Sequence, residues 1–177
     1  DLYEDEWQVA VQSDNASGRI ATLSATHLPQ YAEVIRQSFT TVAKDFGLTK
    51  ENCPDHTSFI SNEHLASKIK DGYIPYGYFV GGKLVGFASL TELGSGVYEM
   101  NDVSILPEYR HYGYGKRLLD FCKTMVKKLG SSKITIGIME ENTVLKDWYA
   151  ANGFIHTGTK KFDHLPFIVG FMEWSAV

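Results

Sequence analysis

Residues 103–116, which read VSILPEYRHYGYGK, decide the fold of this chain. Residues 103–106 end a run of strand-forming residues, and Pro107 stops it because proline has no amide to continue a ladder. The chain then turns through residues 110–115 into a segment with helical periodicity, which Gly130 ends. The apolar face of this expected helix consists of Leu118, Leu119, Cys122, Met125, Val126 and Leu129.

The turn at residues 110–115 has the features that a diphosphate group needs. At the start of a helix several backbone N–H groups are unpaired and carry partial positive charge, and glycines let a ligand approach closely. Arg110, Lys116 and Arg117 add positive charge. An isolated R-x-x-G-x-G segment is explained equally well as a tight strand-to-helix turn, so the rest of the chain has to decide.

The glycine spacing differs from that of two other phosphate-binding loops. A Walker loop requires G-x-x-x-x-G-K-[ST], and a dinucleotide-binding fold requires G-x-G-x-x-G with an acidic residue about twenty positions later. Neither pattern is present here. The sequence therefore disfavours a plain nucleotide-binding protein.

A second motif follows the first, at residues 142–154. Asn142, Tyr149 and the pair Gly153-Phe154 form the pattern N-x(6)-Y-x(3)-G-[FY]. Together with R-x-x-G-x-G after a strand and a proline, this pattern resembles the GCN5-related N-acetyltransferase (GNAT) superfamily. The likeness is strong over residues 97–154 and extends, by the order of the elements, over residues 19–174.

The remaining segments predict a mixed α/β sheet. A meander of strands precedes a strand–helix–strand–helix–strand order, which places helices on the faces of the sheet. The resemblance implies a mostly antiparallel sheet with one splayed parallel pair and about four helices. We expect one helix or two short ones at residues 28–46, and helices at residues 63–69, 116–129 and 143–152. We expect strands at residues 20–23, 76–80, 83–90, 97–106, 134–138, 154–161 and 167–174.

Length and composition narrow the classes of protein. The 177 residues suit one globular domain, which we place at residues 19–177 after an arm or linker at residues 1–18. A net charge of −4 argues against a nucleic-acid partner, and no apolar run reaches the roughly 20 residues that span a bilayer. Two cysteines are too few for a disulfide framework, so we expect a cytoplasmic protein.

The resemblance implies acetyl-CoA as the acyl donor. Backbone amides of the turn would hold the pyrophosphate, and the splayed strand would present amides to the pantetheine and to the acetyl carbonyl. Asn142 suits two roles equally, donating to the pantetheine or capping the helix that follows it. The predicted cofactor-binding residues are Val103, Ser104, Ile105, Arg110, His111, Tyr112, Gly113, Tyr114, Gly115, Lys116 and Asn142.

Tyr149 is the predicted general acid. The departing thiolate needs a proton, and a phenol near the sulfur can donate one while it remains protonated at neutral pH. An aromatic residue at helical spacing from Leu145 is otherwise usually part of a core. The second motif favours the catalytic interpretation.

Glu99 is the predicted general base, because the amine must lose a proton before it attacks. It lies eleven residues before Arg110, similar to the catalytic glutamate in the histone-acetylating branch of the family. Strand alternation predicts that Asp102 faces the opposite side of the strand. A strand carboxylate that is merely solvated or paired is the alternative for both residues.

The expected activity is direct transfer of an acetyl group to a primary amine, which makes the chain an acyltransferase. A non-catalytic acyl-CoA sensor of the same fold is the alternative. Cys53, His56 and His64 are spaced too loosely to predict a metal site. Tyrosines 73, 76, 78 and 98 and the loop at residues 162–166 are candidates for an acceptor pocket. The identity of the amine stays open, and a homodimer would fit the family.

Overall fold

The computed structural model describes residues 12–14, 18–22 and 25–176. Eight strands in these residues form one sheet, in the order β1-β2-β3-β4-β5-β6-β8-β7. Among the strands of the described residues only β5 and β6 run parallel, so the predicted mixed sheet with one parallel pair is confirmed. The strands are β1 (Gln12–Asp14), β2 (Gly18–Thr22), β3 (Ile74–Val80), β4 (Lys83–Glu92), β5 (Val97–Ile105), β6 (Lys133–Met139), β7 (Ile155–Lys161) and β8 (Ile168–Ser175).

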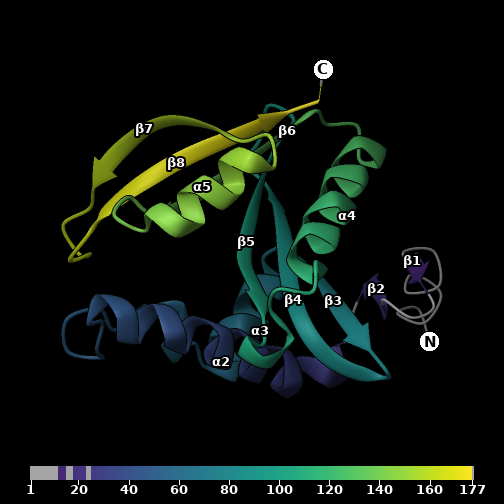
Figure 1. Cartoon of the computed structure of the whole chain (residues 1–177), viewed down its shortest axis with the longest axis horizontal. Helices are drawn as coiled ribbons and strands as arrows, with labels where there is room; N and C mark the ends of the chain where they lie inside the picture. The colour runs from purple at the N-terminus through teal and green to yellow at the C-terminus, as the bar shows by residue number, and fades with distance from the viewer. Residues whose placement is uncertain (1–11, 15–17, 23–24, 177) are drawn as a thin grey trace.

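The described helices lie on opposite faces of this sheet (Figure 1). Tyr31 of α2 packs against Phe87 of β4 on one face, and Phe121 of α4 packs against Tyr76 of β3 on the other. The α-helices are α2 (Leu28–Phe46), α3 (Asn62–Lys70), α4 (Tyr114–Lys128) and α5 (Thr143–Ala151). Short 3-10 turns are η2 (Ala25–His27), η3 (Thr57–Phe59) and η4 (Pro107–Tyr109).

Local sequence explains where these helices begin and end. Proline occupies the first turn of α2, and Gly47 ends that helix with a φ of 65°. The Ser61 side chain accepts a hydrogen bond from the His64 amide and caps α3. The helix boundaries therefore follow closely the ranges that periodicity predicts.

The expected arm at residues 1–18 lies mostly outside the described residues. Its described part, β1, pairs antiparallel with β2. Within residues 25–176 no helix is long and apolar enough to cross a lipid bilayer.

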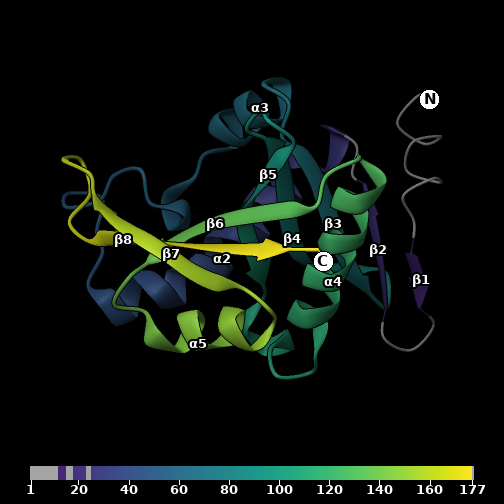
Figure 2. The same ribbon diagram turned by 90° about the horizontal axis from the view of Figure 1, so that it is seen from above.

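The parallel pair separates after a short stretch. Val97, Tyr98 and Glu99 of β5 pair with residues 133–135 of β6, yet both strands continue beyond that point. The two strands run in diverging directions in Figure 2. Past Glu99, one edge of β5 therefore has no ladder partner on β6.

Strand β5 also contains a bulge beside this opening. Asn101 pairs with Ser89 and Ser104 pairs with Phe87, so two residues of β5 lie opposite Ala88 of β4. The first of the two, Asp102, has a φ of 55°, which few non-glycine residues adopt. The bulge changes the direction in which the following side chains point.

Candidate active site

The turn before α4 presents unpaired amides. Among the described residues, the backbone amides of residues 111–116 donate no hydrogen bond, and the first helical bond runs from the Arg117 amide to the Gly113 carbonyl, at 3.1 Å. No side chain caps this end of α4. The positive end of the helix dipole is therefore available to an anion.

Two residues give the turn its shape. His111 has a φ of 68°, and Gly113, the N-cap residue of α4, has a φ of 83°. Left-handed residues alternating with others turn successive amides toward one side, as in anion-binding nests. His111 and Tyr112 are exposed, the latter with 70% of its surface accessible. These geometries fit a pyrophosphate cradle built from main chain.

The Arg110 side chain points away from this cradle. Its guanidinium donates to the Ile105 carbonyl at 3.1 Å, to Thr41 Oγ1 at 3.0 Å and to the Ser38 carbonyl at 2.8 Å. Burial lowers the pKa of this group, while Asp45 and Glu108 raise it. Arg110 therefore ties α2 to the end of β5. The sequence predicts that the positive charge of Arg110 binds phosphate. In the structure the Arg110 guanidinium instead donates hydrogen bonds to α2.

The predicted residues of β5 have buried or half-buried side chains. Ser104 Oγ donates to the Asp102 carbonyl at 2.7 Å, and Ile105 is 9% exposed. Val103 packs against the core. Their side chains are structural, so any contact with a cofactor would come from the main chain on the unpaired edge of β5.

Tyr149 is the buried residue of α5, with 4% of its surface exposed. Its ring packs edge-on against Trp148 and Phe154, with centroid distances of 4.9 and 5.2 Å. Burial raises the pKa of its hydroxyl, so the phenol stays protonated at neutral pH. An added Cβ at Gly115 would lie 3.5 Å from Trp148, which shows that α5 lies against the start of α4. The fold therefore brings the two sequence motifs together.

Asn142 has the capping role. Its Oδ1 accepts a hydrogen bond from the Leu145 amide at 3.2 Å. Pantetheine binding by its amide nitrogen stays a prediction.

Glu99 is half-buried at the last position where β5 pairs with β6. Burial raises the pKa of its carboxyl; the Asn101 side chain and the charge of Lys68 lower it, and Asp102 raises it. Lys68 Nζ lies 3.0 Å from Asp102 Oδ2. Both carboxylates therefore interact with the same lysine of α3.

The structure places the Asp102 side chain against Lys68 of α3, whose charge also acts on Glu99. The bulge adds one residue to β5, and the positive φ of Asp102 directs its side chain to α3. Sequence reasoning also missed Lys68. No local signal identifies it, because its partner lies 34 residues away.

Three of the tyrosines considered for an acceptor pocket belong to the core. Tyr76 and Tyr78 are each 1% exposed, and Tyr98 is 8% exposed. Tyr73 differs, since its ring lies 5.5 Å from Lys68 Nζ. In the loop at residues 162–166, Leu165 packs onto a small apolar cluster that includes Cys53 and Met139.

The residues considered for a metal site have other surroundings. Cys53 is buried in that cluster, and His56 Nδ1 lies 2.7 Å from Ser58 Oγ. No group of three or more metal-binding side chains gathers anywhere in the described residues.

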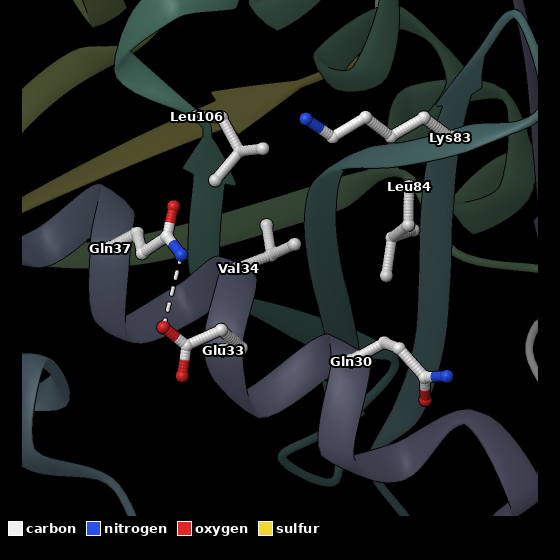
Figure 3. A pocket seen from close by; sticks show the side chains of 7 residues that line it. All are labelled: Gln30, Glu33, Val34, Gln37, Lys83, Leu84 and Leu106. Atoms are coloured by element: carbon white, nitrogen blue, oxygen red, sulfur yellow. Dashed lines mark hydrogen bonds between the residues drawn. The ribbon is translucent and has the colours of Figure 1, made fainter.

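A hollow with a volume of 280 Å³ lies elsewhere, between α2 and the start of β4 (Figure 3). Glu33 and Gln37 form a hydrogen bond of 3.0 Å at its rim. It is lined by Gln30, Glu33, Val34, Gln37, Lys83, Leu84 and Leu106. None of these is a predicted site residue.

Comparison with known proteins shows which family the chain is similar to. The model of the acetyltransferase (GNAT) family matches residues 37–154, more than half of the chain and a span that includes both motifs. The chain belongs to the acetyltransferase (GNAT) family. This GNAT protein is an acyltransferase, and the predicted family is confirmed.

Its relatives agree with this assignment. The GNAT protein is 26% identical over 165 residues to an uncharacterized N-acetyltransferase of Lactobacillus delbrueckii subsp. lactis, covering 86% of this chain and 90% of that protein. Its fold is similar to that of the Escherichia coli ribosomal-protein-S18-alanine N-acetyltransferase, with a TM-score of 0.70, 17% identity and coverage of 88% and 92%. PaiA N-acetyltransferase of Thermoplasma acidophilum, solved with coenzyme A, has a TM-score of 0.67, 23% identity and coverage of 89% and 98%.

Proposed function

We propose that this GNAT protein transfers the acetyl group of acetyl-CoA directly to a primary amine. The observation that carries the proposal is the row of unpaired amides at the uncapped start of α4, beside the separated strands β5 and β6. An anionic pyrophosphate would accept hydrogen bonds from these amides and interact favourably with the helix dipole.

Main-chain groups of β5 would align the thioester. In the segment of Val103, Ser104 and Ile105, β5 has no ladder partner on β6, so the amides that face this edge can donate to the pantetheine and to the acetyl carbonyl. When the amine attacks, the carbonyl oxygen becomes an oxyanion, and a preoriented amide lowers that barrier by about 3 kcal/mol. The rigid bulge of β5 keeps such donors in place.

Two side chains would move the protons. Glu99 accepts a proton from the attacking amine, directly or through a water. The N–C bond forms as the C–S bond breaks, and Tyr149 donates its proton to the departing thiolate. The products are an N-acetylated amine and coenzyme A. A phenol is protonated at neutral pH and can therefore act as the donor.

The acceptor is a small or peptide primary amine. The two free cysteines are both buried, which fits a reducing cytoplasm. A homodimer is a further expectation, which sedimentation velocity would test.

Release of free thiol from acetyl-CoA in the presence of a panel of amines tests the proposal. Amine-dependent release at a rate proportional to protein concentration is the expected result. Binding of acetyl-CoA without amine-dependent release would instead identify a non-catalytic sensor. The panel contains polyamines, aminoglycosides, lysine peptides and peptides with free N-termini.

A further inference from the structure

Lys68 and Asp102 form an ion pair at the point where β5 leaves β6. Lys68 Nζ lies 3.0 Å from Asp102 Oδ2, and only 5% of the Asp102 side chain is exposed. The Lys68 side chain is 22% exposed, and it also lies over the ring of Tyr73. This pair is more shielded from water than the pair of Lys116 and Asp120, so the solvent screens it less.

The pair stabilises a backbone that would otherwise be unfavourable. Asp102 has a φ of 55°, and a left-handed conformation of a non-glycine residue persists only where its surroundings hold it. Two contacts hold it here: the ammonium of Lys68, and the Ser104 hydroxyl, which donates to the Asp102 carbonyl. The first of these comes from α3, so the helix and the bulge are fixed together.

Glu99 lies three residues before Asp102 on β5, within reach of the charges of this pair. Its neighbours in the sheet are uncharged, Thr91 on β4 and Thr135 on β6. Glu173, one strand further on, is paired with Lys133 at 3.3 Å. The charges that act on Glu99 are therefore Lys68 and Asp102, and they act in opposite directions.

We propose that Lys68 is a positioning residue of the acetyl transfer. Through its ion pair with Asp102 it holds the bulge of β5 in place and sets the electrostatic surroundings of Glu99. The inference rests on the proposed function, because it takes Glu99 as the proton acceptor and β5 as the strand that aligns the thioester. Lys68 itself contacts neither substrate.

Two variants that remove one charge each test this role. Lys68→Met keeps the length of the side chain, and Asp102→Asn keeps a residue type that tolerates a positive φ. Because both loosen the bulge, each should lower kcat by about tenfold or more, as small misalignments do. Lys68→Arg should restore most of the activity, and Lys70→Met, which removes an exposed lysine of the same helix, should change little.

The pH dependence of kcat/KM separates positioning from a merely structural role. Without the positive charge of Lys68, Glu99 keeps its proton to a higher pH, so the acid limb of the profile moves up in Lys68→Met. Without the negative charge of Asp102, the limb moves down in Asp102→Asn. Limbs that stay in place, or that move in the same direction in both variants, would overturn the proposal.

Further variants test the role of Lys68 even if one of the single variants does not fold. If Lys68→Met does not fold, because it leaves Asp102 buried and unpaired, Lys68→Arg and Asp102→Asn still give the comparison. The double variant Lys68→Met/Asp102→Asn has no unpaired charge, and its limb should lie between those of the single variants. A Glu99→Gln enzyme with full activity and an unchanged limb would overturn this inference and the role of Glu99 as the proton acceptor, but not the transfer of acetyl to an amine. Absence of amine-dependent thiol release from the unmodified protein would overturn the proposed function.

Discussion

At the scale of single residues, Tyr149 joins packing and proposed chemistry in one side chain. Its ring completes the contact between α5 and the core, and its hydroxyl is the predicted proton donor. Replacement by Phe removes the hydroxyl and leaves the ring. We therefore expect Tyr149→Phe to lower kcat by about 10²-fold or more, in line with the loss of a general acid, with little change in coenzyme A affinity.

Steady-state kinetics and calorimetric titration with coenzyme A measure these two effects. Tyr76→Phe is the matched control, because Tyr76 is also buried and burial also raises the pKa of its hydroxyl. The control should keep its turnover. Equal rates for Tyr149→Phe and the unmodified protein would exclude Tyr149 as the acid.

Gly113 is a residue whose conformation the proposed pyrophosphate cradle requires. At a φ of 83° a side chain is disfavoured by about 1 kcal/mol or more, although the space around its Cβ position is open. Gly113→Ala should therefore lower the melting temperature by about 2–4 °C and weaken coenzyme A binding as the amides reorient.

Gly81→Ala provides the comparison for Gly113→Ala. Gly81 also has a positive φ and open space, and it lies in the β3–β4 hairpin turn. A similar loss of melting temperature with unchanged coenzyme A affinity is expected. If Gly113→Ala and Gly81→Ala weakened coenzyme A binding equally, the loss of affinity would not be due to the cradle at Gly113.

At the scale of elements, Arg110 connects α2 to the segment between β5 and α4. Its hydrogen bonds reach Ser38 and Thr41, about seventy residues earlier in the chain. Arg110→Met would leave two carbonyls without their charged donor. Since hydrogen bonds to charged groups contribute about 1.5–3 kcal/mol, we expect the free energy of unfolding to fall by about 2–3 kcal/mol.

Urea unfolding of a double-mutant cycle tests this connection. Thr41→Val should destabilise the unmodified protein more than the Arg110→Met protein, because both changes remove the Arg110–Thr41 contact. The hydrogen bond from Thr41 Oγ1 to the Ser38 carbonyl is lost in either background. Fully additive losses would contradict a direct link between α2 and the turn.

At the scale of the whole molecule, stability should depend on pH through buried groups. Burial lowers the pKa of His56, so the unfolded chain binds a proton at His56 more readily than the folded protein does. Its contribution to stability is present above the unfolded pKa of about 6.5 and is lost as pH falls toward the lower folded pKa. Glu99 acts in the opposite direction, because its folded pKa is raised.

The free energy of unfolding, measured between pH 7 and pH 5, separates these contributions. His56→Asn retains an acceptor for the Ser58 amide and removes the titration. Its free energy of unfolding should decline less than that of the unmodified protein as pH falls. An equal decline in both proteins would assign the effect to other groups.

The sequence by itself determined the elements that depend on neighbouring residues. Apolar periodicity predicted the helical segment at residues 28–46, which is α2. The two motifs predicted the family. These features are local, because hydrogen bonds within a turn or helix join residues only a few positions apart.

Only the tertiary structure decided which distant side chains meet. The separation of β5 from β6 and the bulge at Asp102 depend on strand register. The same packing brings Lys68 to Asp102 and Arg110 to α2. Strand propensity specifies neither register nor partner, because both depend on contacts between segments far apart in the chain.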